Sequence, residues 1–361
     1  MLKKVLSIFL CVVISALSVV SVSGEVADKP NISAESAVLY CVNDGKIYYS
    51  LNENKRMKNA STTKILSALI TLEEASVNNK QVKFTNEMTA EGSSMYLETD
   101  DVVTLYDLAC GMLICSGNDS ANASAIAISG SLEEFAKRMN TKAKELGMNN
   151  SNFVTPSGLD DDNHYSTACD LAKLMAYAME NKDFAEITGK KSVTVDFISP
   201  KEKSVTYQNH NRLLSLYEYC IGGKTGYTMS AGRCLVSFAE KNGLQFVCVT
   251  LNDKNDWDDH IALYEYGFKN YALCSCDDRD FYLDVAVVGG QKDNVTVEAV
   301  RNYGIVMPTA DALKVKRTVY LDNFIYAPVK QGDYLGKIVY TLNNKQVAEI
   351  PISATETVNI K

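Results

Sequence analysis

The pattern of apolar residues changes once along this chain, close to residue 276. Before that point strand-like and helical spacings alternate. Strands are expected at 37–42, 46–50, 192–197, 204–207, 232–239 and 244–251, and helices at 60–75, 104–114, 120–129, 131–147, 170–181 and 256–273. After that point only strand-like runs recur, separated by turn signals. This order predicts an α+β domain with one antiparallel sheet covered by helices, followed by a small all-β domain.

A chain of 361 residues is long enough for two such domains. Residues 1–24 begin with Lys3 and Lys4, continue as an apolar run and end in small residues, which predicts a secretory signal peptide. We therefore expect a signal peptide at 1–24, an α+β domain at 25–275 and a β-rich domain at 276–361. The apolar run is of borderline length for a membrane span, so retention as a membrane anchor stays open as the alternative.

The charge of the chain argues against one class of partner. The formal net charge is −8, and it becomes −10 without residues 1–24, which hold two lysines and no acidic residue. Proteins that bind nucleic acid carry a basic footprint, so no nucleic-acid partner is expected. The cysteines have neither disulfide-framework nor zinc spacing, and the acidic run 160–162 lacks EF-hand spacing. No metal and no cofactor are therefore expected.

A serine and a lysine three residues apart begin the helix expected at 60–75. This spacing puts Ser61 and Lys64 on the same face of a helix. A serine hydroxyl is a weak nucleophile until a base takes its proton, and a neutral amine within hydrogen-bond reach can do so. The apolar residues that follow predict a buried helix, and burial would suppress the charge of the lysine. By itself, however, a Ser-x-x-Lys pattern is weak evidence.

Two later motifs strengthen the catalytic interpretation. Ser116-Gly117-Asn118 follows an apolar helical run, and Lys224-Thr225-Gly226 precedes the strand expected at 232–239. Each alone is more simply a turn or a solvated surface residue. Together, in this order, they form the signature of penicillin-binding proteins and class A β-lactamases.

The surroundings of these motifs resemble one family in particular. The segments 152–159, 164–168, 116–121 and 224–232 are similar to the low-molecular-mass penicillin-binding proteins, the serine D-alanyl-D-alanine carboxypeptidases. The match covers about residues 33–273, and the tail resembles the β-rich domain that follows in that family. The resemblance implies a serine β-lactamase and penicillin-binding-protein fold, that is, an antiparallel sheet with helices and a helical subdomain.

The resemblance also implies roles for eight residues. The catalytic residues are Ser61, Lys64 and Ser116, and the substrate-binding residues are Asn118, Lys224, Thr225, Gly226 and Tyr227. Ser61 attacks the carbonyl between two D-alanines, Lys64 takes its proton, and Ser116 relays a proton to the leaving nitrogen. Asn118 binds the substrate backbone, Lys224 and Thr225 line the pocket for the terminal carboxylate, and Gly226 allows close approach. The backbone N–H groups of Ser61 and Tyr227 would form the oxyanion hole.

The implied substrates are peptidoglycan stem peptides ending in D-Ala-D-Ala, with β-lactams as covalent inhibitors. The implied location is the cell-wall space of a bacterium, outside the cytoplasm. Two alternatives stay open: a β-lactamase, although Glu180 and Glu186 lack the context of a deacylating glutamate, and a non-catalytic scaffold that binds the cell wall.

The sequence departs from the family pattern at some positions. Many relatives carry an arginine near the start of the last helix of the domain, where this chain has Trp257-Asp258-Asp259. Capture of the carboxylate is therefore expected to depend on Lys224, Thr225 and also Arg233. We expect His164 to be structural, and we do not favour a substrate-side role for His210.

Overall fold

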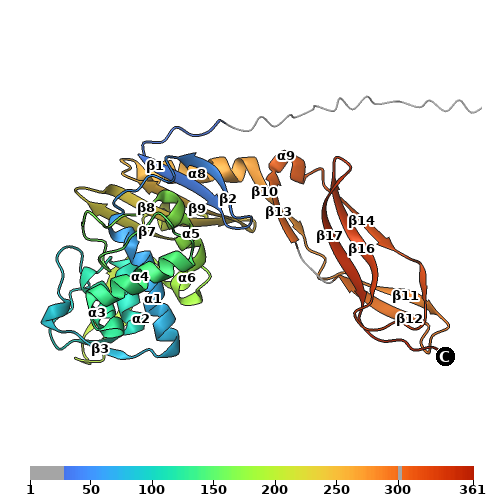
Figure 1. Ribbon diagram of the computed structural model, residues 1–361, viewed down its shortest axis with the longest axis horizontal. Helices are drawn as coiled ribbons and strands as arrows, with labels where there is room; N and C mark the ends of the chain where they lie inside the picture. Colours follow the sequence, from blue (N-terminus) through green and yellow to red (C-terminus); the bar gives the residue numbers. More distant parts are fainter. Residues whose placement is uncertain (1–27, 300–302) are drawn as a thin grey trace, which may run out of the picture.

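The computed structural model describes residues 28–299 and 303–361. The predicted signal peptide at 1–24 lies outside these residues. A larger unit of sheet and helices precedes a smaller unit built mostly of strands, which holds the C-terminus (Figure 1).

A five-stranded antiparallel sheet organises the larger unit. Its strand order is β2-β1-β9-β8-β7. The strands are β1 (Ser36–Cys41), β2 (Lys46–Leu51), β7 (Cys220–Thr228), β8 (Gly232–Lys241) and β9 (Leu244–Leu251). The apolar run of β9 is buried almost throughout because this strand is central and covered on both faces. Among the described residues β7 has a strand partner on one side only, so it is an edge strand. On its other side Thr188 Oγ1 donates to the carbonyl oxygen of Gly223 and accepts from its N–H group.

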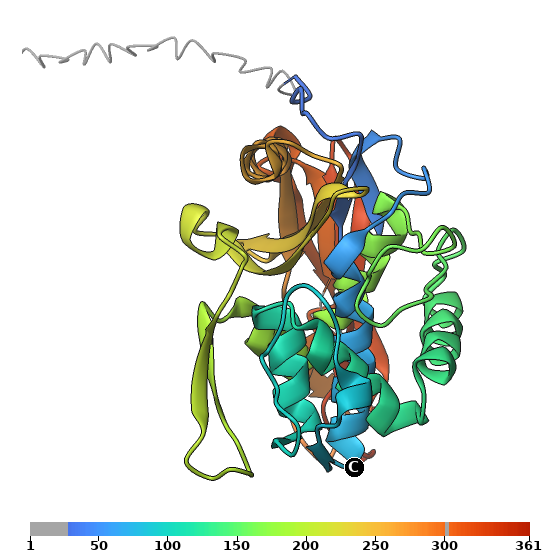
Figure 2. The same ribbon diagram turned by 90° about the vertical axis from the view of Figure 1, so that its left-hand side faces the viewer.

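Helices cover both faces of this sheet. Alternate residues of β8 point to opposite faces: Val236 joins the core formed with α1 and α2, whereas Leu235 joins the core formed with α8. The first face carries α1 (Lys64–Val77), α2 (Leu105–Ile114), α3 (Asn118–Ser129), α4 (Leu132–Glu145), α5 (Ala168–Ala178) and α6 (Lys182–Gly189). The second face carries α7 (Leu213–Leu216) and α8 (Asp256–Asn270). Figure 2 shows the helical block beneath the sheet, with a ribbon of two strands at its side.

Shorter elements complete the larger unit. Two 3-10 turns are present, η1 (Ala60–Thr63) and η2 (Asn86–Met88). Two ribbons pair β3 (Gln81–Lys83) with β4 (Val102–Thr104), and β5 (Ser192–Asp196) with β6 (Ser204–Gln208).

A two-stranded ribbon, β10 (Tyr271–Cys276) with β13 (Tyr303–Pro308), leads into the smaller unit. There, a six-stranded sheet has the order β14-β16-β17-β12-β11-β15. Its strands are β11 (Tyr282–Val288), β12 (Asn294–Ala299), β14 (Lys316–Leu321), β15 (Phe324–Tyr326), β16 (Tyr334–Leu342) and β17 (Lys345–Ala354). Inward-facing valines and isoleucines of these strands form a separate core.

The predicted fold class, an α+β domain followed by a β-rich one, is confirmed. Some details of the prediction were wrong. The closing helix ends at Asn270, because Tyr271 is already extended and pairs with Pro308 across the ribbon. A one-turn helix, α9 (Thr309–Ala312), interrupts the expected all-β pattern. The domain boundary between residues 275 and 276 stays a prediction.

Candidate active site

Ser61 and Lys64 are brought together where α1 begins. Lys64 is fully buried, and its Nζ donates hydrogen bonds to Ser61 Oγ at 2.8 Å and to the carbonyl oxygen of Ser157 at 2.6 Å. The sequence predicted Ser61 in the first turn of a helix and Lys64 one turn later on the same face. Instead, Ser61 lies in the 3-10 turn η1, and Ala60 has a φ of 46°, which a right-handed helix excludes.

The environment of the two lysines disfavours their charged forms. Burial lowers the pKa of Lys64 well below that of an exposed lysine, and the nearby charge of Lys224 lowers it further. Burial likewise lowers the pKa of Lys224 to about 7, against a smaller opposing influence of Cys115. Lys64 can therefore provide a neutral amine near neutral pH, as a base acting on Ser61 requires.

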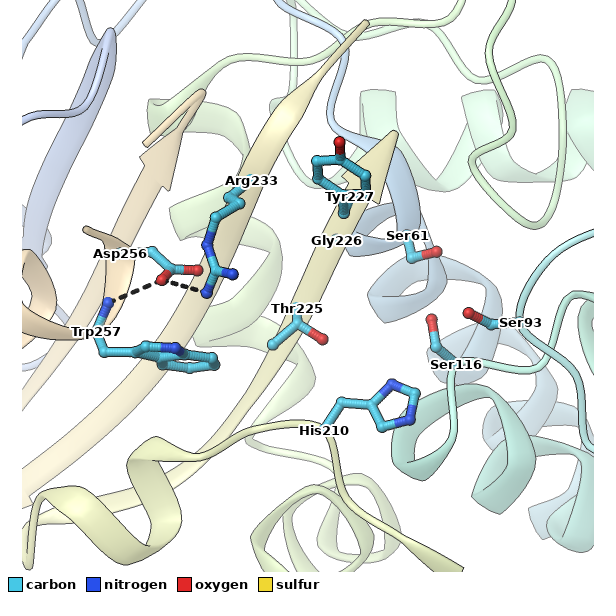
Figure 3. A pocket seen from close by; sticks show the side chains of 10 residues that line it. All are labelled: Ser61, Ser93, Ser116, His210, Thr225, Gly226, Tyr227, Arg233, Asp256 and Trp257. Carbon is cyan, nitrogen blue, oxygen red and sulfur yellow. Dashed lines mark hydrogen bonds and ion pairs between the residues drawn. The ribbon is translucent and has the colours of Figure 1, made fainter. Parts of the chain in front are cut away.

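Ser116 lies between α2 and α3 and contacts the second lysine. Its Oγ accepts a hydrogen bond from Lys224 Nζ at 3.0 Å, and the same Nζ donates to the carbonyl oxygen of Thr225 at 2.7 Å. Ser116 has a φ of 60°, an uncommon conformation for a residue with a side chain. Such conformations concentrate at functional sites. Ser61, Ser93 and Ser116 point toward the same space (Figure 3).

Asn118, the first residue of α3, uses only part of its hydrogen-bonding capacity. Its Nδ2 donates to the carbonyl oxygen of Glu91 at 2.6 Å. Its Oδ1 is buried and has no hydrogen-bond partner within the part of the chain that the structure describes. A buried acceptor without a partner costs free energy. Within these residues Oδ1 is thus an unsatisfied acceptor, two residues beyond Ser116.

The strand β7 approaches the nucleophile closely at Gly226. A Cβ atom at this position would lie 3.0 Å from the backbone nitrogens of both Ser61 and Thr62. A side chain here would push the strand and η1 apart, so glycine allows their close approach. Thr225 and Tyr227 flank Gly226 on the same strand (Figure 3).

A cleft of about 300 Å³ separates β7 from the helical side of the unit. It is lined by Ser61, Ser93, Ser116, His210, Thr225, Gly226, Tyr227, Arg233, Asp256 and Trp257. Arg233 forms an ion pair of 2.6 Å with the buried Asp256, and its guanidinium lies 5.6 Å from the ring centre of Trp257. Burial raises the pKa of Asp256, and Arg233 opposes this effect. The pair fixes a cation at the cleft (Figure 3).

Known proteins are similar to this chain in sequence and in fold. Residues 23–255 match the family described as D-alanyl-D-alanine carboxypeptidase, peptidase S11. The chain belongs to this family. Residues 277–359 match the C-terminal domain of penicillin-binding protein 5. The predicted function, a serine D-Ala-D-Ala carboxypeptidase, is thereby confirmed at the level of the family.

Individual relatives cover most of the carboxypeptidase. It is 31% identical over 336 residues to D-alanyl-D-alanine carboxypeptidase DacF of Bacillus subtilis (strain 168), covering 90% of this chain and 85% of that protein. It is 30% identical to DacA of Haemophilus influenzae, covering 96% and 92% of the two chains. The crystal structure of penicillin-binding protein 5 from Haemophilus influenzae has a TM-score of 0.68 at 29% identity, covering 92% of this chain and 99% of that chain.

The carboxypeptidase brings the eight predicted residues into one region. Ser61, Ser116, Thr225, Gly226 and Tyr227 line the cleft. The two lysines contact serines of that lining. The amide of Asn118 is buried two residues beyond Ser116. The roles of these residues stay predictions.

Sequence reasoning missed two residues of the lining, Ser93 and Asp256, and assigned no role to Trp257. Ser93 belongs to a polar loop that has no pattern of its own. The carboxylate of Asp119 holds this loop by accepting from Met95 N at 2.8 Å. Asp256, the first residue of α8, carries no local signal because its partner Arg233 comes from a different element, the strand β8. Trp257, the single tryptophan of the chain, stands in a segment that departs from the family pattern.

The other candidates lie away from the cleft, except His210. His164 is buried behind η1, where it contacts Thr63. Glu180 is exposed, and Glu186 forms an exposed pair with Lys190, so neither reaches Ser61. Within residues 28–299 and 303–361, no three His, Cys, Asp or Glu side chains form a group that could hold a metal ion.

Proposed function

We propose that this carboxypeptidase removes the terminal D-alanine from peptidoglycan stem peptides through an acyl-enzyme on Ser61. The observation that carries the proposal is the buried amine of Lys64, 2.8 Å from Ser61 Oγ. Burial keeps the amine neutral, and the distance lets it take the hydroxyl proton directly.

In the first step, Ser61 Oγ bonds to the carbonyl carbon of the penultimate D-alanine, and its proton passes to Lys64. Negative charge develops on the carbonyl oxygen. The backbone N–H groups of Ser61 and Tyr227 receive this charge, supported by the close approach of β7 at Gly226. The C–N bond then breaks, and the proton held by Lys64 reaches the leaving amine through Ser116. Water hydrolyses the ester and restores Ser61.

In this proposal the substrate lies along the edge of β7 that has no strand partner among the described residues, beyond Gly223, whose backbone groups are bonded to Thr188. Backbone groups of an edge strand can pair with an extended peptide. Asn118 Oδ1, which lacks a partner among the described residues, accepts an N–H group of the same peptide from the opposite side. The substrate backbone is thus held between the strand and α3.

The terminal carboxylate is held by Thr225 and Arg233, next to the amine of Lys224, whose protonated form a bound carboxylate favours. Asp256 orients Arg233 by accepting from Nη2 at 2.6 Å, and it leaves the remaining guanidinium donors for the substrate. Arginine on β8 would then do what an arginine near the last helix does in many relatives.

Stem peptides ending in D-Ala-D-Ala and β-lactams as covalent inhibitors follow from this chemistry, and no cofactor takes part in it. Action on peptidoglycan requires a place outside the cytoplasm, in the cell-wall space. No helix within the described residues is long and apolar enough to cross a bilayer. We propose secretion through the segment 1–24, and its retention as an anchor stays the alternative.

The test is release of D-alanine from a synthetic peptide ending in D-Ala-D-Ala, compared with the same peptide carrying a C-terminal amide. We expect release from the free acid, strongly reduced release from the amide, and none with Ser61→Ala. Equal hydrolysis of acid and amide would contradict the carboxylate site. Release that persists in Ser61→Ala would contradict the nucleophile.

A further inference from the structure

His164 is a buried histidine, 2% exposed, that bridges two segments behind the nucleophile. Its Nδ1 accepts hydrogen bonds from the backbone nitrogens of Val154 at 3.1 Å and Thr155 at 3.3 Å. Its Nε2 lies 2.8 Å from Thr63 Oγ1. One ring atom therefore holds a loop, and the other holds the turn η1.

These contacts determine the protonation of the ring. A nitrogen that accepts two N–H groups carries no proton, so the proton of the neutral ring is on Nε2 and is donated to Thr63. Burial lowers the pKa of His164 to about 4; the charge of Lys64 acts in the same direction, and Asp160 and Asp161 act in the opposite one. The ring is thus neutral wherever Lys64 can act as a base.

Both segments that His164 contacts are connected to Lys64. Thr63 immediately precedes Lys64 and ends the turn that contains Ser61. The loop that begins at residue 154 continues to Ser157, whose carbonyl oxygen accepts from Lys64 Nζ at 2.6 Å. His164 therefore fixes both the start of α1 and the acceptor that holds the amine.

The 154–158 loop lies very close to the turn η1. A Cβ atom at Gly158 would lie 2.0 Å from the carbonyl oxygen of Ala60 and 2.8 Å from Thr63 Oγ1. Ala60 itself has a φ of 46°, a conformation that persists only when the surroundings impose it. The clamp formed by His164 is one such constraint, next to the nucleophile.

We propose that His164 is a positioning residue, which sets the place of Lys64 Nζ relative to Ser61 Oγ through Thr63 and the 154–158 loop. The inference rests on the proposed function, because it assigns His164 a part in activating Ser61. His164 does not line the cleft, so its loss slows acylation without weakening β-lactam binding.

Three variants separate the two ends of the clamp. His164→Asn keeps an acceptor near Nδ1 and loses the donor to Thr63. His164→Gln keeps a donor near Nε2 and loses the acceptor for the loop. His164→Leu removes both.

His260 offers a matched control. It is fully buried, its Nδ1 contacts Ser237 Oγ at 2.6 Å, and burial lowers its pKa to about 3. It lies on α8, across the sheet from Ser61. His260→Leu therefore reports the cost of losing a buried histidine without a connection to Lys64.

Acylation rates measured over a range of fluorescent penicillin concentrations give the limiting rate and the penicillin concentration at half of that rate. The amount of protein is counted as the sites that penicillin can acylate. For His164→Leu we expect a limiting rate lower by about 100-fold with an unchanged half-saturating concentration, the cost of a base displaced by about 1 Å. His164→Asn and His164→Gln should lie between this variant and wild type. His260→Leu should keep the wild-type rate.

Wild-type acylation rates in all three His164 variants would overturn the positioning role of His164 but not the proposed function. So would an equal loss of rate in His260→Leu, which would show a general structural cost. If His164→Leu does not fold, the Asn and Gln variants decide, and a loss in either supports the clamp. A wild-type protein that penicillin does not acylate at Ser61 would overturn the proposed function, and this inference with it.

Discussion

Two arginine–aspartate pairs, one in each unit, have nearly the same local structure. Arg233 and Arg317 are 44% and 40% exposed, and their partners Asp256 and Asp278 are 3% and 6% exposed. Each guanidinium also lies over an aromatic ring, at 5.6 Å from Trp257 and 5.5 Å from Phe281. The pairs differ in what surrounds them.

In the smaller unit a further protein group binds the aspartate of the pair. Asp278 accepts from Arg317 Nε at 2.8 Å and from the hydroxyl of Tyr340 at 2.7 Å. In the larger unit Arg233 and Trp257 line the cleft. An arginine–aspartate pair that is surrounded by protein atoms is structural, whereas a similar pair beside a cleft is available to a ligand.

The buried lysines extend this contrast. Lys64 and Lys224 are buried without an acidic partner at ion-pair distance in the part of the chain that the structure describes, whereas Asp278 is the one buried charged residue of the smaller unit there. Burying an unpaired amine lowers stability. The larger unit thus carries a cost in stability that its chemistry explains.

The largest effect is expected from Lys64→Met. Removing the base should lower the acylation rate by about 1,000-fold or more, within the range for a general base. Replacing the buried amine by an apolar chain of similar length should also raise the melting temperature. Acylation kinetics and calorimetry on the same preparation check both. A variant that loses both activity and stability would contradict the assignment of Lys64 as a costly buried amine.

Arg233→Leu tests whether the Arg233–Asp256 pair binds the substrate. KM for a peptide with a free terminal carboxylate should rise by about 10- to 100-fold, the contribution of a charge-assisted hydrogen bond. The matched control is Arg317→Leu, which should leave KM unchanged. Steady-state kinetics on both variants decide, and equal KM values for Arg233→Leu and wild type would remove Arg233 from the carboxylate site.

The pH dependence of stability should differ between wild type and Lys224→Met. The pKa of Lys224 is about 7 in the folded protein, against 10.5 for an exposed lysine. Between these values the unfolded chain binds a proton that the folded chain lacks, so this group makes stability rise with pH. The stabilisation of Lys224→Met over wild type should therefore shrink from pH 7 to 10. Melting curves that keep a constant difference would contradict the lowered pKa of Lys224.

The smallest effect on activity is expected from Asp278→Asn. The variant should lose about 1 to 3 kcal/mol of unfolding free energy, because a buried charge-assisted hydrogen bond is broken. D-alanine release should stay at the wild-type rate. Denaturant unfolding and the peptide assay check this, and a large fall in release would mean that the smaller unit contributes to the chemistry.

The sequence carried the local features of the fold and of the site. The apolar runs of β8 and β9 and the Ser-x-x-Lys spacing follow from side-chain period, so the strands and the pair of Ser61 with Lys64 were predictable. The 3-10 turn was not, because Ala60 packs against Gly158, nearly a hundred residues away in the chain. The pairing of Arg233 with Asp256 and the entry of Ser93 into the cleft likewise depend on tertiary contacts.

Bringing Ser61, Ser116 and Lys224 together required the family resemblance rather than any pattern in the chain. Each motif alone has a simpler explanation as a turn or a surface residue. Spacing along the chain contains no information on distance between segments that are separated by a sheet and several helices.

Intact-protein mass spectrometry over time after exposure to benzylpenicillin tests the central claim most directly. The account predicts a persistent adduct of one penicillin per chain, absent from Ser61→Ala. An adduct that disappears quickly while hydrolysed penicillin accumulates would instead indicate a β-lactamase. The absence of any adduct on the folded wild-type protein would contradict the claim that Ser61 is the nucleophile, and would favour a non-catalytic wall-binding protein.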